Sequence, residues 1–257
     1  LDKIILSKML SLEMFGYYSL ASAIAMNLYR IVYPVNAGIY PRITQLVSLG
    51  DQEGLKQFYH KSCQFISVMI LPVTVIIAMF SYQILLIWTQ NPVMAEKTHL
   101  LVSILICGTA LNGLMNAPYL LQLANGWTKL GLFTNLIAVM ILVPMMVFLT
   151  SQYGALGGAS AWVILNCGYV LIAIHFMHRR LLPHEKWHWY WQDVCIPLMT
   201  SALIAGLGRL FMDGQMSQLM MIFYLLVVSV STIVITVIIT PTTRIWLFNK
   251  ISNLKLA

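Results

Sequence analysis

The sequence is poor in charge. Asp, Glu, Lys and Arg together make up 9% of its 257 residues, whereas hydrophobic residues make up 60%. A soluble domain carries roughly 25% charged residues, because its surface has to be solvated. The scarcity of charge therefore excludes an ordinary soluble domain, and it predicts a chain whose surface mostly meets lipid.

Short segments of alternating polarity, which are typical of membrane β-strands of about ten residues, are also lacking. The apolar runs are instead continuous over about twenty residues, the length that a helix needs to cross a bilayer. We predict an all-α, polytopic transmembrane helix bundle with about seven full spans plus one partial one. The partial span covers residues 1–11, and the full spans run at about 16–47, 62–89, 98–123, 130–150, 157–177, 194–212 and 218–240.

Patterns that would indicate a metal, a disulfide or an enzyme are lacking as well. The four cysteines are widely scattered without CxxC spacing, so neither a disulfide framework nor a metal site is predicted. His184 and His188 share a helix face, but we expect no metal there because no third ligand lies nearby in the sequence. We expect no cofactor. Asp51 and Glu53 suit a helix cap, and we interpret Glu96, Glu185, Asp193 and Asp213 as isolated acids, which disfavours an enzyme.

The net charge of +7 does not indicate a nucleic-acid partner, because the basic residues gather in alternate connections rather than on one face. One set of connections holds Arg42, Lys56, Lys61, Lys129, Arg179, Arg180 and Lys186, with Arg244, Lys250 and Lys255 in the tail. The opposite set holds Lys8, Lys97 and Arg209. By the positive-inside rule, the first set and the C-terminus are predicted to be cytoplasmic.

Two segments bear on domain organisation. The chain starts with Leu1 inside what reads as a helix, so we expect an N-terminal portion to be missing. Leu181–Asp193 mixes aromatic and basic residues between apolar runs. Such a composition predicts a cytoplasmic interfacial segment lying against lipid headgroups.

Three ionisable residues fall inside predicted spans, where a charge costs about 2.5–3.5 kcal/mol and is a functional candidate by default. They are Asp2, Lys3 and Arg30. With Asn27 and Tyr33 they predict a hydrated, cation-rich cavity that holds an anionic group such as a diphosphate, for which the planar fork of Arg is suited. The alternative is a buried ion pair of Asp2 with Arg30 or Lys3.

Further polar residues lie within the later spans. They are Asn112, Asn116, Tyr119, Gln122 and Asn166. Such residues either line a pathway or bridge helices by hydrogen bonds, and the sequence leaves both uses open.

The order of several short motifs resembles that of a known family. The motifs are Asp2-Lys3-Ile4-Ile5-Leu6, Gly16-Tyr17-Tyr18-Ser19, Tyr40-Pro41-Arg42, Asp51, Pro118-Tyr119, Ala124-Asn125-Gly126-Trp127-Thr128-Lys129, Asn135, Pro144 and Tyr153-Gly154-Ala155-Leu156-Gly157-Gly158-Ala159. Over residues 1–180 they resemble the second half of bacterial polysaccharide flippases of the multidrug/oligosaccharidyl-lipid/polysaccharide exporter superfamily.

The resemblance implies a two-lobed exporter of the bacterial inner membrane. Residues 1–180 would be the C-terminal lobe, from the end of helix 7 to helix 12. Residues 181–193 would be a cytoplasmic loop, and 194–257 two additional helices and a tail. Asp2 would fit the acidic position of helix 7, and Arg30 a cationic one on helix 8. The implied partners are undecaprenyl-diphosphate-linked oligosaccharide units (O-antigen or a related glycan), membrane lipids, the missing N-terminal lobe, and Na⁺ or H⁺ as coupling ion.

Two other functions remain as alternatives. A cation-coupled multidrug antiporter of the same superfamily would carry acidic sites within its lobes, but Asp2 is the single acid inside a predicted span. A membrane glycan polymerase or ligase would need a large periplasmic loop with Arg and His, and the outward loops predicted here are short. A purely structural scaffold would leave Arg30 unexplained.

Overall fold

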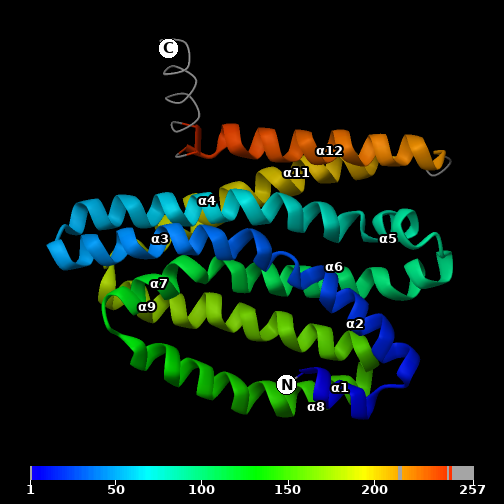
Figure 1. Ribbon diagram of the computed structural model, residues 1–257, viewed down its shortest axis with the longest axis horizontal. Helices are drawn as coiled ribbons and strands as arrows, with labels where there is room; N and C mark the ends of the chain where they lie inside the picture. Colours follow the sequence, from blue (N-terminus) through cyan, green and yellow to red (C-terminus); the bar gives the residue numbers. More distant parts are fainter. Residues whose placement is uncertain (1, 214–215, 242, 245–257) are drawn as a thin grey trace, which may run out of the picture.

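The structure, a computed structural model, describes residues 2–213, 216–241 and 243–244. Within these residues it is a helix bundle without a strand, which confirms the predicted all-α class. Five helical stretches are long and apolar enough to cross a membrane: Gln52–Met79, Pro92–Ala124, Thr128–Leu181, Lys186–Leu210 and Gln218–Ile239. Figure 1 shows the long helices lying side by side along the long axis of the molecule.

The helices follow one another along the chain with short connections. They are α1 (Asp2–Met9), α2 (Leu12–Met26), α3 (Tyr29–Leu49), α4 (Gln52–Met79), α5 (Ser81–Thr89), α6 (Pro92–Leu114), α7 (Asn116–Ala124), α8 (Thr128–Gly168), η1 (Tyr169–Ala173), α9 (Ile174–Leu181), α10 (Lys186–His188), η2 (Trp189–Cys195), α11 (Ile196–Leu210) and α12 (Gln218–Ile239). The two η segments are π-helical. α12 packs on α11, and both pack on α4.

Three of the predicted spans are each divided into two helices. The span at 16–47 breaks between α2 and α3, the span at 62–89 breaks at Phe80, and the span at 98–123 breaks at Met115. Pro34 and Pro118 follow two of these breaks closely. A proline lacks an N–H and its ring collides with the carbonyl four residues earlier, which for Pro118 is the carbonyl of Leu114, the last residue of α6. Pro34 lies within α3 and does not explain the break before it.

The two predicted spans at 130–150 and 157–177 are the legs of a hairpin within α8. The chain reverses at Gly154, whose φ of 58° and ψ of −138° are not helical, and Figure 1 shows the second leg running back beside the first. The legs touch near the turn, because a Cβ on Gly157 would lie 2.0 Å from the carbonyl oxygen of Leu149. Only a glycine allows this approach.

The two sets of connections defined by their charge lie at opposite ends of the bundle. The α3–α4 and α7–α8 connections and the end of α9 share one end, and the α1–α2 and α5–α6 connections share the other (Figure 1). At the second end, Lys97 Nζ donates to Glu13 Oε1 at 2.9 Å. Lys250 and Lys255 lie outside the described residues, and the cytoplasmic assignment of the basic end stays a prediction.

The segment Leu181–Asp193 contains both exposed and buried side chains, and its contact with lipid headgroups stays a prediction. Trp187 and Trp191 are exposed, but Trp189 and Asp193 are fully buried. The reason is the π-helical segment η2, which packs against α4. The interpretation of Asp193 and Glu185 as isolated acids was wrong, because both are bonded to side chains of α4.

Candidate functional site

Two helix breaks lie next to each other and are joined by side-chain hydrogen bonds. α3, which begins just after the first break, packs along α7, which begins just after the break at Met115. The Tyr29 hydroxyl donates to Asn112 Oδ1 at 2.8 Å, and Asn36 Nδ2 donates to Asn116 Oδ1 at 2.7 Å. Discontinuous helices of this kind form the substrate sites of many transporters near the middle of the bilayer.

The hydrogen bonds continue from α6 into the second leg of α8. Asn112 Nδ2 donates to Asn166 Oδ1 at 2.8 Å, and Asn166 Nδ2 donates to the Trp162 carbonyl at 2.7 Å. Asn166 is fully buried. The question that the sequence left open is thus answered in part, because Asn112, Asn116 and Asn166 bridge helices.

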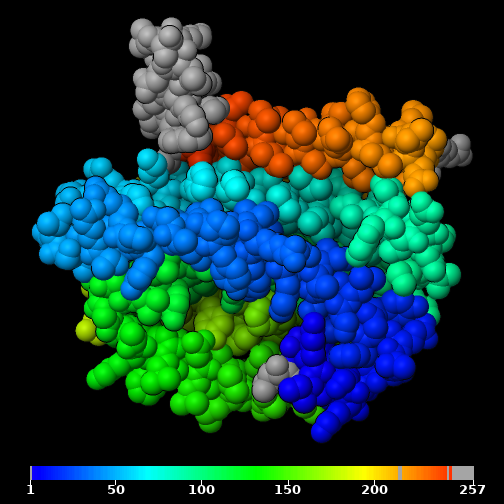
Figure 2. Space-filling model, viewed as in Figure 1, coloured from blue at the N-terminus to red at the C-terminus, as the bar shows by residue number. Residues whose placement is uncertain are grey.

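Asn112 and Asn116 also border a cavity of about 490 Å³ between α6, α7 and the legs of α8. Its polar and aromatic lining consists of Asn112, Asn116, Tyr119, Gln122, Thr134, Asn135, Trp162 and Tyr169. Across it, the Tyr169 hydroxyl donates to Asn135 Oδ1 at 2.8 Å. Figure 2 shows a hollow in this region, between α3 on one side and α7 and the first leg of α8 on the other. None of the described residues that line this cavity is charged.

A second cavity of about 220 Å³ lies beside the first and shares Leu142 and Trp162 with it. Asp2 lines this smaller cavity, and the Tyr18 hydroxyl donates to Asp2 Oδ2 at 3.2 Å. The rest of its wall is mostly apolar and includes Met26. The smaller cavity thus places one acidic group beside the uncharged, amide-lined larger cavity.

The structure brings together only some of the residues predicted to form the site. Asp2 lines a cavity, whereas Lys3 and Arg30 are exposed and do not border either cavity. Asn27 is exposed and donates to the Ala23 carbonyl at 2.8 Å. Tyr33 is 62% exposed and stacks on Tyr29 with the ring centroids 5.5 Å apart. Asn27 and Arg30 flank the break before α3. Their part in a substrate site stays a prediction.

Sequence reasoning did not identify the residues of α8 and η1 that line the larger cavity. Thr134, Asn135, Trp162 and Tyr169 lie in runs so apolar that single polar or aromatic residues do not stand out. The signal that could have identified them is the presence of polar and aromatic side chains within apolar spans. Amides, hydroxyls and aromatic rings are unusual neighbours within a membrane span unless they bond to each other or to a ligand.

The arrangement suits an uncharged ligand rich in hydroxyl groups. Each Asn or Gln side chain offers two N–H donors and a carbonyl acceptor, and each hydroxyl both donates and accepts. Aromatic rings add apolar faces of defined shape. A sugar presents hydroxyl groups around apolar C–H faces, so the lining of the larger cavity complements it without any charge.

Comparison with known proteins agrees with the fold. The family model described as MatE matches residues 1–149, which is more than half of the chain. A Shigella flexneri protein named "Putative O-antigen transporter" is 23% identical over 163 residues, a stretch that covers 63% of this chain and 38% of that protein. The chain thus spans well under half the length of that relative. No solved structure matches it at a significant level.

Proposed function

Because the chain belongs to the MatE family, we propose that it is the C-terminal lobe of a transporter that flips lipid-linked oligosaccharides. The family and the relative named as a transporter favour transport over enzymatic chemistry. The proposed substrate is an undecaprenyl-diphosphate-linked repeat unit for surface polysaccharide such as O-antigen. It would cross the bacterial inner membrane with the help of an N-terminal lobe and of Na⁺ or H⁺ as coupling ion.

The observation that carries this proposal is the amide- and aromatic-lined cavity beside two broken helices. A drug-sized apolar cation offers few hydrogen-bonding groups to the amides and hydroxyls of this lining, whereas a glycan forms hydrogen bonds with them. Buried polar groups that lose their water need such partners, because an unpaired one costs about 1–3 kcal/mol. The relative's name points in the same direction as this chemistry.

The diphosphate end of such a substrate needs positive charge. Arg30 is exposed in the first turn of α3, on the chain segment that also carries Tyr29 and Tyr33. We propose that Arg30 contacts the diphosphate while the glycan occupies the cavity, with the basic end of the bundle facing the cytoplasm.

The test uses the whole gene in its bacterial host. A deletion strain is complemented with the wild type, with Asn135→Leu, or with Asn125→Leu at equal protein level. Asn125 is the matched control, since its Nδ2 donates to the Leu121 carbonyl and it does not border the cavity. Surface polysaccharide and lipid-linked units that face the cytoplasm are then quantified.

We expect the deletion to lose surface polysaccharide and to accumulate unflipped units. Asn135→Leu should show a partial form of the same defect, and Asn125→Leu should behave as wild type. Normal polysaccharide in the deletion strain would refute the flippase function. A defect in the deletion together with full activity of Asn135→Leu would keep the function and remove the cavity from the pathway.

A cation-coupled drug antiporter is the second candidate, and the smaller cavity favours it. A carboxylate in a largely apolar cavity, here Asp2 beside Met26 and Trp162, suits a cation. If the protein is an antiporter, the deletion should raise sensitivity to lipophilic cations, and Asp2→Asn should fail to restore resistance while surface polysaccharide stays normal.

A further inference from the structure

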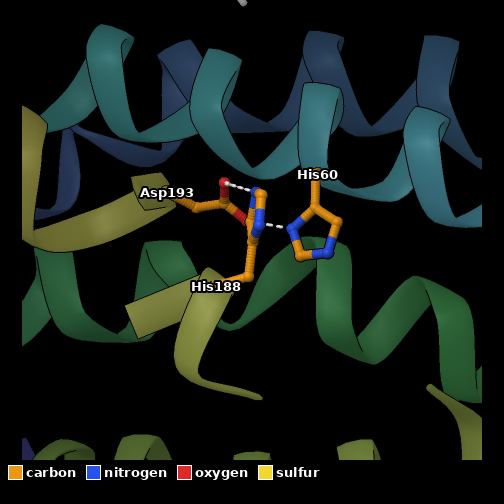
Figure 3. A group of neighbouring side chains, drawn as sticks. All are labelled: His60, His188 and Asp193. Atoms are coloured by element: carbon orange, nitrogen blue, oxygen red, sulfur yellow. Dashed lines mark hydrogen bonds and ion pairs between the residues drawn. The ribbon is translucent and has the colours of Figure 1, made fainter. Parts of the chain in front are cut away.

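Three potential metal ligands meet between α4 and the segment that follows α9. His60 extends from α4, His188 ends α10 and Asp193 lies in η2, and Figure 3 shows the three side chains pointing toward one another. Asp193 is fully buried and His60 is 7% exposed, while the side chain of His188 is 37% exposed. A buried carboxylate is normally paired or bound to a metal, because an isolated one is costly in an apolar interior.

The distances place one donor atom of each residue around a common point. His60 Nδ1 lies 2.5 Å from Asp193 Oδ2, and His188 Nε2 lies 3.9 Å from Asp193 Oδ1. The two imidazole rings are 4.1 Å apart between centroids, and one ligand atom from each of the three residues lies within 4.8 Å of the others.

The π-helical geometry of η2 explains how His188 and Asp193 come to one side. Residues five apart point about 140° away from each other around an α-helix with its 3.6 residues per turn. The i→i+5 bonding of a π-helix instead sets them about one turn apart, and such segments recur at functional sites. η2 begins at Trp189, directly after His188, and contains Asp193.

We propose that His60, His188 and Asp193 bind a divalent transition-metal ion of the Zn²⁺ class. Two imidazoles and a carboxylate are borderline donors that suit Zn²⁺ and its first-row neighbours rather than Mg²⁺ or Ca²⁺. Ligand atoms at about 2.0–2.1 Å from a tetrahedral Zn²⁺ are about 3.3 Å apart. The His60 Nδ1–Asp193 Oδ2 separation of 2.5 Å is shorter than this value and the His188 Nε2–Asp193 Oδ1 separation of 3.9 Å is longer, so the side chains would have to adjust around a bound ion.

A second layer of hydrogen bonds is already in place around the three ligands. His60 Nε2 lies 3.1 Å from Glu185 Oε2, and Glu185 Oε1 is held by Lys56 Nζ at 2.6 Å. Gln64 Nε2 donates to Asp193 Oδ1 at 2.9 Å. A ligating histidine almost always donates its other ring N–H to a carboxylate or carbonyl, which fixes the tautomer and orients the ring. His60 and Glu185 have this arrangement.

Glu185 supplies a negative charge beside the three ligands. Burial alone would raise the pKa of the Glu185 carboxyl, but the hydrogen bond from Lys56 and the charges of His60 and Lys56 keep it below its ordinary range. Glu185 is thus an acceptor, and His60 Nε2 donates to it. Zn²⁺ would bind His60 through Nδ1, the ring nitrogen that faces Asp193.

Such a metal would tie α4 to the segment that leads into α11. The ion would enter from the side of His188, which is the most exposed of the three ligands. This inference does not depend on the proposed transport function, because His60, His188 and Asp193 line neither of the two cavities.

The test measures zinc bound by the whole protein in detergent micelles. The protein is treated with EDTA, dialysed against Zn²⁺, passed through a desalting column and analysed for zinc by mass spectrometry. The variants are His188→Ala and Asp193→Asn, with His184→Ala as matched control. His184 is an exposed histidine of the same connection and is not part of the cluster.

We expect the wild type and His184→Ala to retain about one more zinc ion per chain than His188→Ala. Zn²⁺ should also raise the unfolding temperature of the wild type but not that of His188→Ala. Because His188 is partly exposed, its truncation leaves the fold intact even if Asp193→Asn misfolds. Equal zinc content in the wild type and in a monodisperse His188→Ala would overturn the proposal.

Discussion

The hydrogen bonds between the two helix breaks lead to a quantitative prediction for Asn112. Its side chain accepts from Tyr29 and donates to Asn166. Asn112→Leu keeps the shape but removes both bonds, which on average contribute about 0.6 kcal/mol each between membrane helices. It also leaves the amide oxygen of Asn166, in a fully buried residue, without this donor, at about 1–3 kcal/mol. We expect the free energy of unfolding to fall by about 1–3 kcal/mol.

The assay is reversible unfolding in mixed micelles with increasing SDS, followed by helical circular dichroism. Tyr29→Phe alone should cost about 0.6 kcal/mol. The double variant Tyr29→Phe/Asn112→Leu should cost less than the sum of the single variants by a similar amount. Asn27→Leu, which removes a bond to the backbone of its own helix, serves as the control. Strict additivity of Tyr29→Phe and Asn112→Leu, within about 0.3 kcal/mol, would refute the view that this bond joins the two breaks.

Three further outcomes are expected. Gly157→Ala should lower the unfolding temperature, because its Cβ would overlap the Leu149 carbonyl. The control Gly16→Ala should not, because no atom lies within 4 Å of its Cβ. Equal unfolding temperatures of the two variants would contradict the close contact in the α8 hairpin. In a variant from which the native cysteines are removed, Lys61→Cys should react with a membrane-impermeant thiol reagent only from the cytoplasm, and Glu96→Cys only from outside. The reverse pattern would show that the predicted orientation in the membrane is wrong. Arg30→Ala should reduce surface polysaccharide at equal protein level and Arg30→Lys should reduce it less, and full activity of Arg30→Ala would leave Arg30 without a part in transport.

The sequence was sufficient to predict the class of fold, because apolar length and scarce charge depend only on composition along the chain. It did not predict the breaks near Asn27 and Met115, although Pro34 and Pro118 were visible. Membrane helices often accommodate a proline without ending, so the residue alone does not distinguish a bend from a break. The breaks became recognisable through the hydrogen bonds between α3, α6 and α7.

Contacts between residues far apart in the chain were the feature of the structure that the sequence predicted least well. A helical-wheel argument selected His184 and His188 as a pair, but His184 lies in a turn with a φ of 72° and the segment after His188 is π-helical. His60 and Asp193 are 133 residues apart, and no periodicity connects positions so far apart. The amide side chains were each identified in the sequence as polar residues within spans. The hydrogen bond between Asn112 and Asn166 could not be predicted, because it depends on how α6 packs against the second leg of α8.

The separation between His60 and Asp193 has a consequence for how the protein is made. At a synthesis rate of about 5–20 residues per second, the 133 residues that separate them take roughly 7–27 s to emerge. During this interval α4 is already synthesised, and His60 and Gln64 lack their carboxylate partner. The newly made helix therefore has to keep this turn near the hydrated edge of the bilayer until η2 arrives. The contacts of α4 with Asp193 thus form only after η2 has been synthesised, well after α4 itself.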